Sequence, residues 1–338
     1  MVRPSRSALP SKSRQFTLPP RPALWNNPHV PAPADNAISA TTRFCAVYGH
    51  PIKHSASPPM QNAGIAELGL PWRYLAFDVP PEKLGEAIKG AAAMRFIGLN
   101  LTVPHKLLAL DLVDELDETA RMWGAVNTIR FEAKDASGDW RPLRDVPAET
   151  VDAIRTVGFN TDADAIVRSL REDLGYEPRG GNILVLGAGG AGSVAALRLA
   201  AEGAGRLWLV NRTAAKAMAV AEDIRKRFPG VAVSLGYPDG EVDLVLNATS
   251  LGLKPTDALP LDLGAFPLTR ARFAYDMIYR PSETPFLKHA REAGLKTANG
   301  LGMLLYQGAK ALEIWSGRPA PIDVMRQALR TAIYGSAQ

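Results

Sequence analysis

The sequence predicts an α/β protein of two domains, the first of which carries a mostly parallel sheet. Short apolar strands alternate with helical segments from residue 43 onward, which is typical of βαβ units. A glycine-rich turn stands between a predicted strand and a predicted helix near the middle of the chain. The length of 338 residues is enough for two domains of ordinary size.

Composition and charge exclude several classes of protein. The chain is 46% hydrophobic and 22% charged, as soluble globular proteins are. It contains no run of 18 apolar residues, so we expect no membrane-spanning helix. Most of the net charge of +5 comes from residues 1–42, which hold five basic residues and one acidic residue. Because the rest of the chain lacks a broad basic field, we expect no nucleic-acid partner.

Residues 1–42 are rich in Pro, Ser and Ala and are predicted to be a disordered basic tail. They lack the apolar core of a secretory signal, although an organelle transit peptide or a misassigned start codon would also explain them. The single cysteine, Cys45, excludes an intrachain disulfide and favours a reducing compartment, which predicts a cytoplasmic protein. No C-x-x-C or H-E-x-x-H motif occurs and the five histidines do not cluster, so we expect no metal site.

In the N-terminal part, apolar and β-branched runs predict strands, and apolar residues at helical spacing predict helices. The strands span 44–48, 72–79, 96–100 and 126–131, and the helices span 59–68, 81–94 and 106–123. A polar hairpin is expected at 133–140. The segment 141–158 contains Pro and Arg, and a short helix is predicted over 149–156.

The C-terminal half continues the alternation. Its predicted strands span 182–186, 206–210, 231–235, 242–247 and 273–277. Its predicted helices span 163–174, 213–228, 300–315 and 322–334, with a further helix after the glycine-rich turn.

The glycine-rich turn matches the G-x-G-x-x-G fingerprint of dinucleotide-binding βαβ units. Residues with little or no side chain let the backbone approach a pyrophosphate closely, and the helix N-terminus meets its negative charge. These residues are Gly187, Ala188, Gly189, Gly190 and Ala191. The pattern predicts a Rossmann domain, although a turn that serves only to pack the helix on the sheet would look similar.

The end of the next strand predicts the cofactor. NAD-binding units usually place an acidic residue there, whereas this chain has Asn211, Arg212 and Thr213, with Lys216 one turn later. An arginine can pair with a 2′-phosphate, so the sequence favours NADP over NAD. A solvated basic turn at the start of a helix is the alternative. Asn247 and Thr249 end another strand, at the position where open α/β sheets bind ligands.

Taken together, nine segments resemble the signature segments of the shikimate dehydrogenase family, which includes shikimate and quinate dehydrogenases. They occur in the family's order from Phe44 to the C-terminus. They lie at 54–58 (HSASP), 100–106 (NLTVPHK), 124–128 (GAVNT), 160–162 (NTD), 187–191 (GAGGA), 211–213 (NRT), 247–250 (NATS), 275–279 (YDMIY) and 300–303 (GLGM).

The resemblance implies an activity and a domain plan. The activity is the NADPH-dependent, reversible reduction of 3-dehydroshikimate to shikimate in aromatic amino acid biosynthesis, by a monomer or homodimer. Residues 43–162, with 300–338 returning as C-terminal helices, would form the substrate domain, and 163–299 would form the Rossmann NADP-binding domain. Relative to the family, the connection over 134–157 contains an insertion.

Within this plan, Lys106 and Asp162 are the expected acid-base pair. Hydride delivery to a ketone leaves a developing alkoxide, which needs a proton and nearby positive charge. A lysine just beyond a strand end can supply both, and an aspartate can hold it or share its proton. Taken singly, Lys106 would be interpreted as a solvated lysine and Asp162 as a helix cap.

The resemblance also implies contacts to the substrate and to the nicotinamide. Ser55 and Ser57 would bind the substrate carboxylate, although alone they would be interpreted as helix caps. The remaining expected substrate ligands are Thr102, Asn127, Tyr279 and Gln307, and Met277 and Gly300 would line the nicotinamide. Two alternatives remain open: an enzyme of this fold that acts on quinate or an amino analogue with NAD or NADP, and a non-catalytic protein that senses nucleotide.

Overall fold

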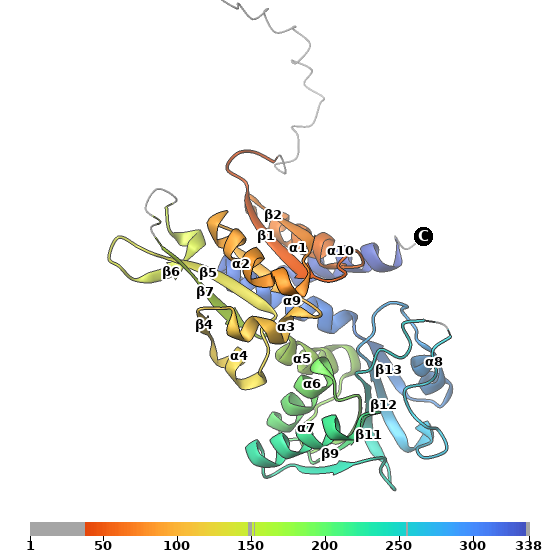
Figure 1. The fold of residues 1–338 in the computed structure, drawn as a ribbon. Helices are drawn as coiled ribbons and strands as arrows, with labels where there is room; N and C mark the ends of the chain where they lie inside the picture. The colour runs from red at the N-terminus through yellow and green to blue at the C-terminus, as the bar shows by residue number, and fades with distance from the viewer. Residues whose placement is uncertain (1–37, 148–150, 152, 255, 336–338) are drawn as a thin grey trace, which may run out of the picture. The chain divides into compact units, whose positions relative to one another are not determined.

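The computed structural model describes residues 38–147, 151, 153–254 and 256–335, and the predicted tail falls largely on residues outside this range. The described chain contains two β-sheets with helices around them (Figure 1). Among the described residues, no helix is long and apolar enough to cross a membrane.

The first sheet has the strand order β2-β1-β3-β5-β7-β4, with β6 paired to β5. Its strands are β1 (Arg43–Gly49), β2 (Trp72–Asp78), β3 (Gly98–Leu101), β4 (Glu115–Leu116), β5 (Thr128–Lys134), β6 (Trp140–Pro142) and β7 (Ile154–Phe159). Strands β2, β1 and β3 are parallel, as expected, but β5 runs antiparallel to β3, β6 and β7. The sheet is therefore mixed rather than mostly parallel.

The direction of β5 follows from the connection before it. Residues 102–127 stay at the carboxyl end of β3, where the amide of Leu101 donates to the carbonyl of Asn127. Because β5 starts at the end where β3 finishes, it can only run back along its neighbour. The helix predicted over 106–123 is also interrupted within this connection. It is divided into α3 (His105–Leu108), a 3₁₀ turn η3 (Ala109–Asp111), β4 and α4 (Glu118–Trp123), which the side chain of Asp117 caps.

The prediction of a short helix over 149–156 is wrong for the residues of this segment that the structure describes. Residues 148–150 and 152 lie outside the described residues, and Ile154–Thr156 belongs to β7. The β-branched residues Ile154, Thr156 and Val157 favour a strand, and β7 pairs with β5 along its whole length. The expected insertion over 134–157 thus includes β6 and the first part of β7.

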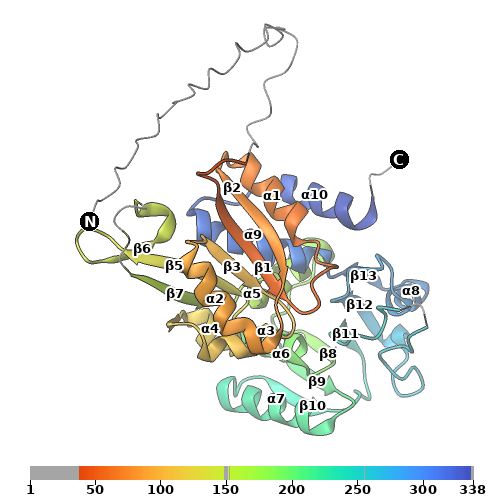
Figure 2. The same ribbon diagram turned by 45° about the horizontal axis from the view of Figure 1, so that its top comes forward.

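Both faces of the first sheet are buried. Along β1, Cys45 and Val47 point into a core with helices α1 (Ser57–Glu67), α9 (Leu301–Ser316) and α10 (Ile322–Tyr334). Ala46 and Tyr48 point into a core with α2 (Leu84–Ala93). Helices lie on both faces of this sheet (Figure 2). Because the side chains of a strand alternate between the two faces, a strand that is covered on both sides must be almost continuously apolar. The 3₁₀ turns η2 (Pro81–Lys83) and η4 (Leu143–Asp145) lie at the margins of this region.

The second sheet is parallel throughout, with the order β10-β9-β8-β11-β12-β13. Its strands are β8 (Asn182–Leu186), β9 (Arg206–Val210), β10 (Ala232–Leu235), β11 (Val242–Asn247), β12 (Ala271–Asp276) and β13 (Lys296–Asn299). Its helices are α5 (Asp162–Leu174), α6 (Gly190–Ala201), α7 (Ala214–Arg227) and α8 (Pro285–Glu292), with a 3₁₀ turn η6 (Leu268–Arg270). This order is that of a Rossmann fold, with its switch point between β8 and β11.

The C-terminal helices α9 (Leu301–Ser316) and α10 (Ile322–Tyr334) leave β13 and return to the first sheet, as expected. Trp315 of α9 is fully buried, and its indole Nε1 donates to the carbonyl of Ile129 at 2.9 Å. Gly98 of β3 makes room for this ring, because a Cβ there would lie 2.0 Å from the indole nitrogen.

Gly98→Ala should therefore destabilise the protein by about 1–3 kcal/mol, because the added methyl group overpacks a filled core. The matched control is Gly90→Ala in α2, where a Cβ would meet no heavy atom within 4 Å. Removing a glycine from a helix interior should stabilise the control by up to about 1 kcal/mol. Urea unfolding measures both changes, and equal free energies of unfolding in the two variants would contradict the packing argument.

Candidate active site

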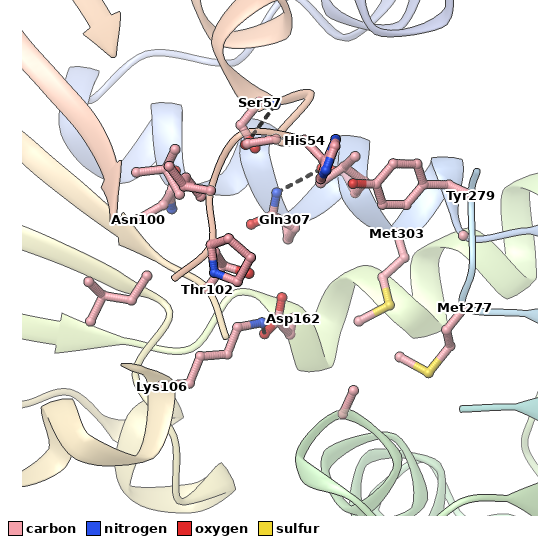
Figure 3. A pocket seen from close by; sticks show the side chains of 18 residues that line it. His54, Ser57, Asn100, Thr102, Lys106, Asp162, Met277, Tyr279, Met303 and Gln307 are labelled. Atoms are coloured by element: carbon pink, nitrogen blue, oxygen red, sulfur yellow. Dashed lines mark hydrogen bonds and ion pairs between the residues drawn. The ribbon is translucent and has the colours of Figure 1, made fainter. Parts of the chain in front are cut away.

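A cavity of about 360 Å³ brings together residues of the first sheet, residues that follow β12 and β13 of the second sheet, and residues of α6 and α9 (Figure 3). Most of the predicted substrate and nicotinamide residues line it. These are Ser55, Ser57, Thr102, Lys106, Asp162, Met277, Tyr279, Gly300 and Gln307, and Ala191 of the glycine-rich turn lines the cavity as well. Eight further lining residues were not predicted as site residues, and they include His54, Asn100 and Met303.

The centre of the polar wall is an ion pair between Lys106 and Asp162. The Lys106 Nζ donates to Asp162 Oδ2 at 2.6 Å, although the two residues are 56 positions apart. Their side chains are 31% and 12% exposed, so the cavity side of the pair remains open to a ligand. A partly desolvated ammonium beside a carboxylate is suited to give or take a proton at a substrate oxygen.

Asp162 does not serve as the helix cap that it resembles in the sequence. It is the first residue of α5, and the amides of Asp162 and Ala163 donate instead to the side-chain oxygen of Asn160, at 3.1 and 3.2 Å. The carboxylate is therefore available to Lys106. The aspartate and the lysine come from different helices, so no spacing rule could have paired them.

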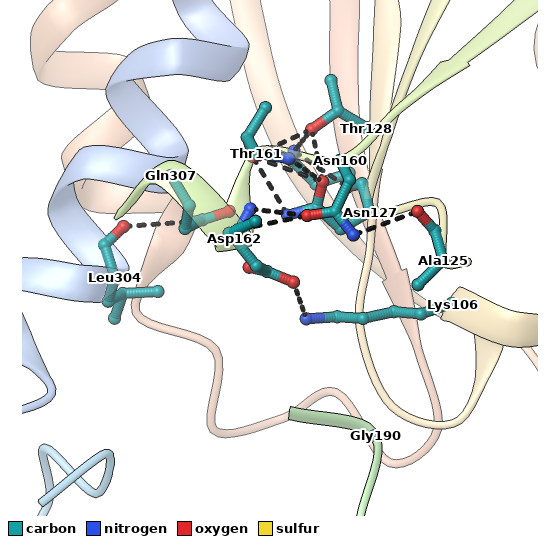
Figure 4. A network of polar contacts seen from close by, with 12 residues as sticks. Lys106, Ala125, Asn127, Thr128, Asn160, Thr161, Asp162, Gly190, Leu304 and Gln307 are labelled. Carbon is teal, nitrogen blue, oxygen red and sulfur yellow. Dashed lines mark hydrogen bonds and ion pairs between the residues drawn. The ribbon is translucent and has the colours of Figure 1, made fainter. Parts of the chain in front are cut away.

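A buried network of amides and hydroxyls lies behind this pair (Figure 4). Asn127 is 1% exposed and does not line the cavity. Its Oδ1 accepts from the amide of Thr161 at 2.8 Å, and its Nδ2 donates to the Thr161 hydroxyl at 3.0 Å. Asn100 does line the cavity, and its Nδ2 donates to the Asn127 carbonyl and to the Thr128 hydroxyl. The signal for Asn100 was present, because an amide inside a buried strand needs polar partners.

The opposite wall carries the residues expected to meet a carboxylate. Helix α1 has no side-chain cap, and the Ser55 hydroxyl accepts only a long bond of 3.4 Å from the Ser57 amide. The helix-cap alternative for the two serines therefore explains little of their geometry. Gln307 donates to the Leu304 carbonyl one turn earlier in α9. Burial raises the pKa of the Tyr279 phenol, so this side chain stays neutral and can donate a hydrogen bond.

The glycine-rich turn connects β8 to α6, and two of its positions require glycine in this structure. Gly187 has φ +103, which favours a residue without a side chain. At Gly192, a Cβ would lie 2.2 Å from the Gly187 carbonyl oxygen, so the helix could not pack this closely on the turn. At Gly189 and Gly190, a Cβ would meet no heavy atom within 4 Å. This open backbone at a helix N-terminus fits a pyrophosphate.

Asn211 and Asn247 hold the strand ends beside the turn. The Asn211 side chain accepts from the Ala188 amide at 3.0 Å and donates to the Thr213 carbonyl at 2.8 Å. Asn247 is fully buried between Asp276 and Thr249, and it accepts from the Thr249 hydroxyl at 2.7 Å. Both amides therefore shape backbone that a nucleotide would contact.

Arg212 and Lys216 lie at the end of β9 and the start of α7. Both are exposed, and neither forms an ion pair with another described residue. Two such cations beside the turn fit a phosphate group. Within the described ranges, no group of three or more His, Cys, Asp or Glu residues is arranged to hold a metal ion.

Three family models match the chain. The shikimate dehydrogenase substrate binding domain matches residues 47–129, the shikimate / quinate 5-dehydrogenase model matches 171–250, and the shikimate 5′-dehydrogenase C-terminal domain matches 300–330.

Curated and solved proteins are similar over nearly their whole length. The shikimate dehydrogenase (NADP(+)) of Methanopyrus kandleri is 39% identical, covering 87% of this chain and 97% of the relative. A structure of shikimate 5-dehydrogenase from Thermus thermophilus in complex with NADP(H) and shikimate is 36% identical, with a TM-score of 0.70, covering 86% and 99%. The 5-ketofructose reductase of a Gluconobacter strain is 32% identical, with a TM-score of 0.71, covering 87% and 99%.

The glycine geometry predicts two separable defects. Gly189→Ala should leave the melting temperature of the free protein unchanged and weaken NADPH binding about tenfold or more, because it displaces a charged group from backbone donors worth about 1.5–3 kcal/mol each. Gly192→Ala should instead lower the melting temperature without nucleotide. Calorimetric titration and thermal unfolding distinguish the two, and a nucleotide affinity unchanged by Gly189→Ala would contradict binding at this turn.

Proposed function

Because the chain belongs to the shikimate dehydrogenase family, we propose that it catalyses the NADPH-dependent, reversible reduction of 3-dehydroshikimate to shikimate. The observation that carries this proposal is the Lys106–Asp162 ion pair in the wall of a cavity that Met277 and Gly300 also line. A non-catalytic nucleotide sensor would have no physical need for such a pair beside that cavity.

In the proposed mechanism, reduced nicotinamide supplies the hydride to the ketone carbon when it is bound. Lys106 donates a proton to the carbonyl oxygen as that oxygen becomes an alkoxide, and takes the proton back in the reverse reaction. Asp162 holds the ammonium in place and accepts a hydrogen bond from a neighbouring ring hydroxyl. Ser55, Ser57 and Tyr279 bind the carboxylate of the substrate, because each offers a hydroxyl donor.

The remaining ring hydroxyls would be bound by Thr102, Gln307 and Asn127. Asn127 is 1% exposed and does not line the cavity, so it can reach the substrate only if the residues around it move. The division into a substrate domain (43–162 and 300–338) and a nucleotide domain (163–299) is supported by the two separate sheets. We further propose a cytoplasmic monomer or homodimer, and the single, buried and free Cys45 supports a reducing compartment.

The first test is turnover followed through the absorbance of reduced nicotinamide. The wild-type protein should oxidise shikimate with NADP⁺ faster than quinate, and faster than either substrate with NAD⁺. Lys106→Ala should lower kcat about 10²- to 10⁴-fold, the usual contribution of general acid-base catalysis, with little change in NADPH affinity. Lys83→Ala, which removes an exposed ion pair with Glu86, is the matched control. Undiminished turnover in Lys106→Ala would remove the lysine from the mechanism.

NADP selectivity is proposed to rest on Arg212, aided by Lys216 and Thr213. Arg212→Ala should raise KM for NADP⁺ about 10- to 100-fold, because a charge-assisted pair with the 2′-phosphate is lost. KM for NAD⁺ should stay constant, since NAD⁺ has no phosphate there. Lys226→Ala, at the far end of α7, is the control and should change neither value. A parallel rise in both KM values would show that Arg212 does not read the phosphate.

A further inference from the structure

Asn160 makes a set of contacts that link the two halves of the ion pair. Its side-chain oxygen accepts from the amides of Asp162 and Ala163, and its Nδ2 donates to the carbonyl of Ala125 at 3.1 Å. Its backbone amide donates to the Thr119 hydroxyl at 2.9 Å. Asn160 is 3% exposed, it does not line the cavity, and it therefore contacts no substrate.

The two bonds that the Asn160 oxygen accepts matter because the Asp162 carboxylate could otherwise accept from the same amides. The first amides of a helix have no partner within the helix, and an aspartate in the first turn is attracted to them. With Asn160 already accepting from the amides of Asp162 and Ala163, these two donors no longer compete for the Asp162 carboxylate. It can then extend toward Lys106, where the structure has it at 2.6 Å.

The donor bond matters because of where Ala125 lies. The next residue, Val126, donates its amide to the carbonyl of Lys106 at 2.9 Å. The segment Ala125–Val126 is therefore hydrogen-bonded on one side to the backbone of Lys106 and on the other side to Asn160. Figure 4 shows the bond between Asn160 and Ala125. The spacing between ammonium and carboxylate is then fixed by neutral amide bonds rather than by the ion pair alone.

We propose that Asn160 is a positioning residue for the reaction, which sets the distance between Lys106 and Asp162 through both ends of its amide. The inference rests on the proposed function, since it concerns the same acid-base pair. A loss of about 1 Å in placement can cost on the order of 10²-fold in rate. Asn160→Ala should therefore lower kcat about 10- to 100-fold while KM for NADP⁺ changes little.

A double-mutant cycle distinguishes positioning from mere structural support. If Asn160 acts through the carboxylate, then adding Asn160→Ala to Asp162→Asn should lower kcat by no more than about twofold further. Asn160→Ser keeps a short acceptor for the helix amides and should recover much of the lost kcat. The matched control is Asn62→Ala. Asn62 bridges the carbonyl and the amide of Tyr74 in the same two-way manner, so its loss should lower the melting temperature but not kcat.

The decisive measurements separate this inference from the proposed function. A crystal structure of Asn160→Ala should have the Asp162 carboxylate turned to the α5 amides and withdrawn from Lys106, whatever the enzyme's substrate. An intact pair in that structure, or the same fold-loss of kcat in the wild-type and Asp162→Asn backgrounds, overturns the positioning role. Wild-type protein that does not turn over shikimate refutes the proposed function instead, and the crystal structure still decides the role of Asn160.

Discussion

The contact between Lys106 and Asp162 depends on the pairing of strands that are far apart in the chain, which no local sequence pattern encodes. Helix α3 begins where β3 ends, and helix α5 begins where β7 ends. These strands are both neighbours of β5, so the sheet brings two helix starts to one edge, although Lys106 and Asp162 lie 56 residues apart. The antiparallel course of β5 is what places its first residues, and the segment before them, between the two helices. A fully parallel sheet would have moved this segment to the opposite end.

A second constraint is the close approach of backbone at the switch point of the second sheet. The carbonyl of Gly187 lies where any side chain at position 192 would have to be, so α6 sits directly on the turn. The absence of side chains at 189 and 190 leaves the helix N-terminus bare toward the cavity side, where Ala191 is one of the lining residues. Small residues are therefore needed for two reasons. At 192 they let α6 pack on the turn, and at 189 and 190 they leave the helix N-terminus open to a ligand.

Much of this could be predicted because it is encoded locally. Strand alternation and the fingerprint of the glycine-rich turn identified the Rossmann half, and its strand order follows from right-handed βαβ crossovers. The direction of β5 and the strand β7 depend on pairing between segments that are distant in the chain, so local patterns gave a parallel sheet and a short helix instead. The strand β13 and the helix α8 were not predicted either. Both are short, so their apolar residues do not form a periodic pattern long enough to identify them. Asn100 was overlooked because its role depends on its hydrogen bonds to Asn127 and Thr128, which become apparent only once the strand is known to be buried.

The asparagines of the signature segments share one physical task. Asn127, Asn160, Asn211 and Asn247 each stand at or beyond a strand end, and each bonds backbone groups through both its oxygen and its nitrogen or through neighbouring hydroxyls. An amide can accept from an N–H and donate to a carbonyl at once without carrying charge, which a carboxylate cannot do. These side chains therefore hold the loops at the strand ends with neutral groups, and Lys106 and Asp162 form an ion pair in the wall of the cavity.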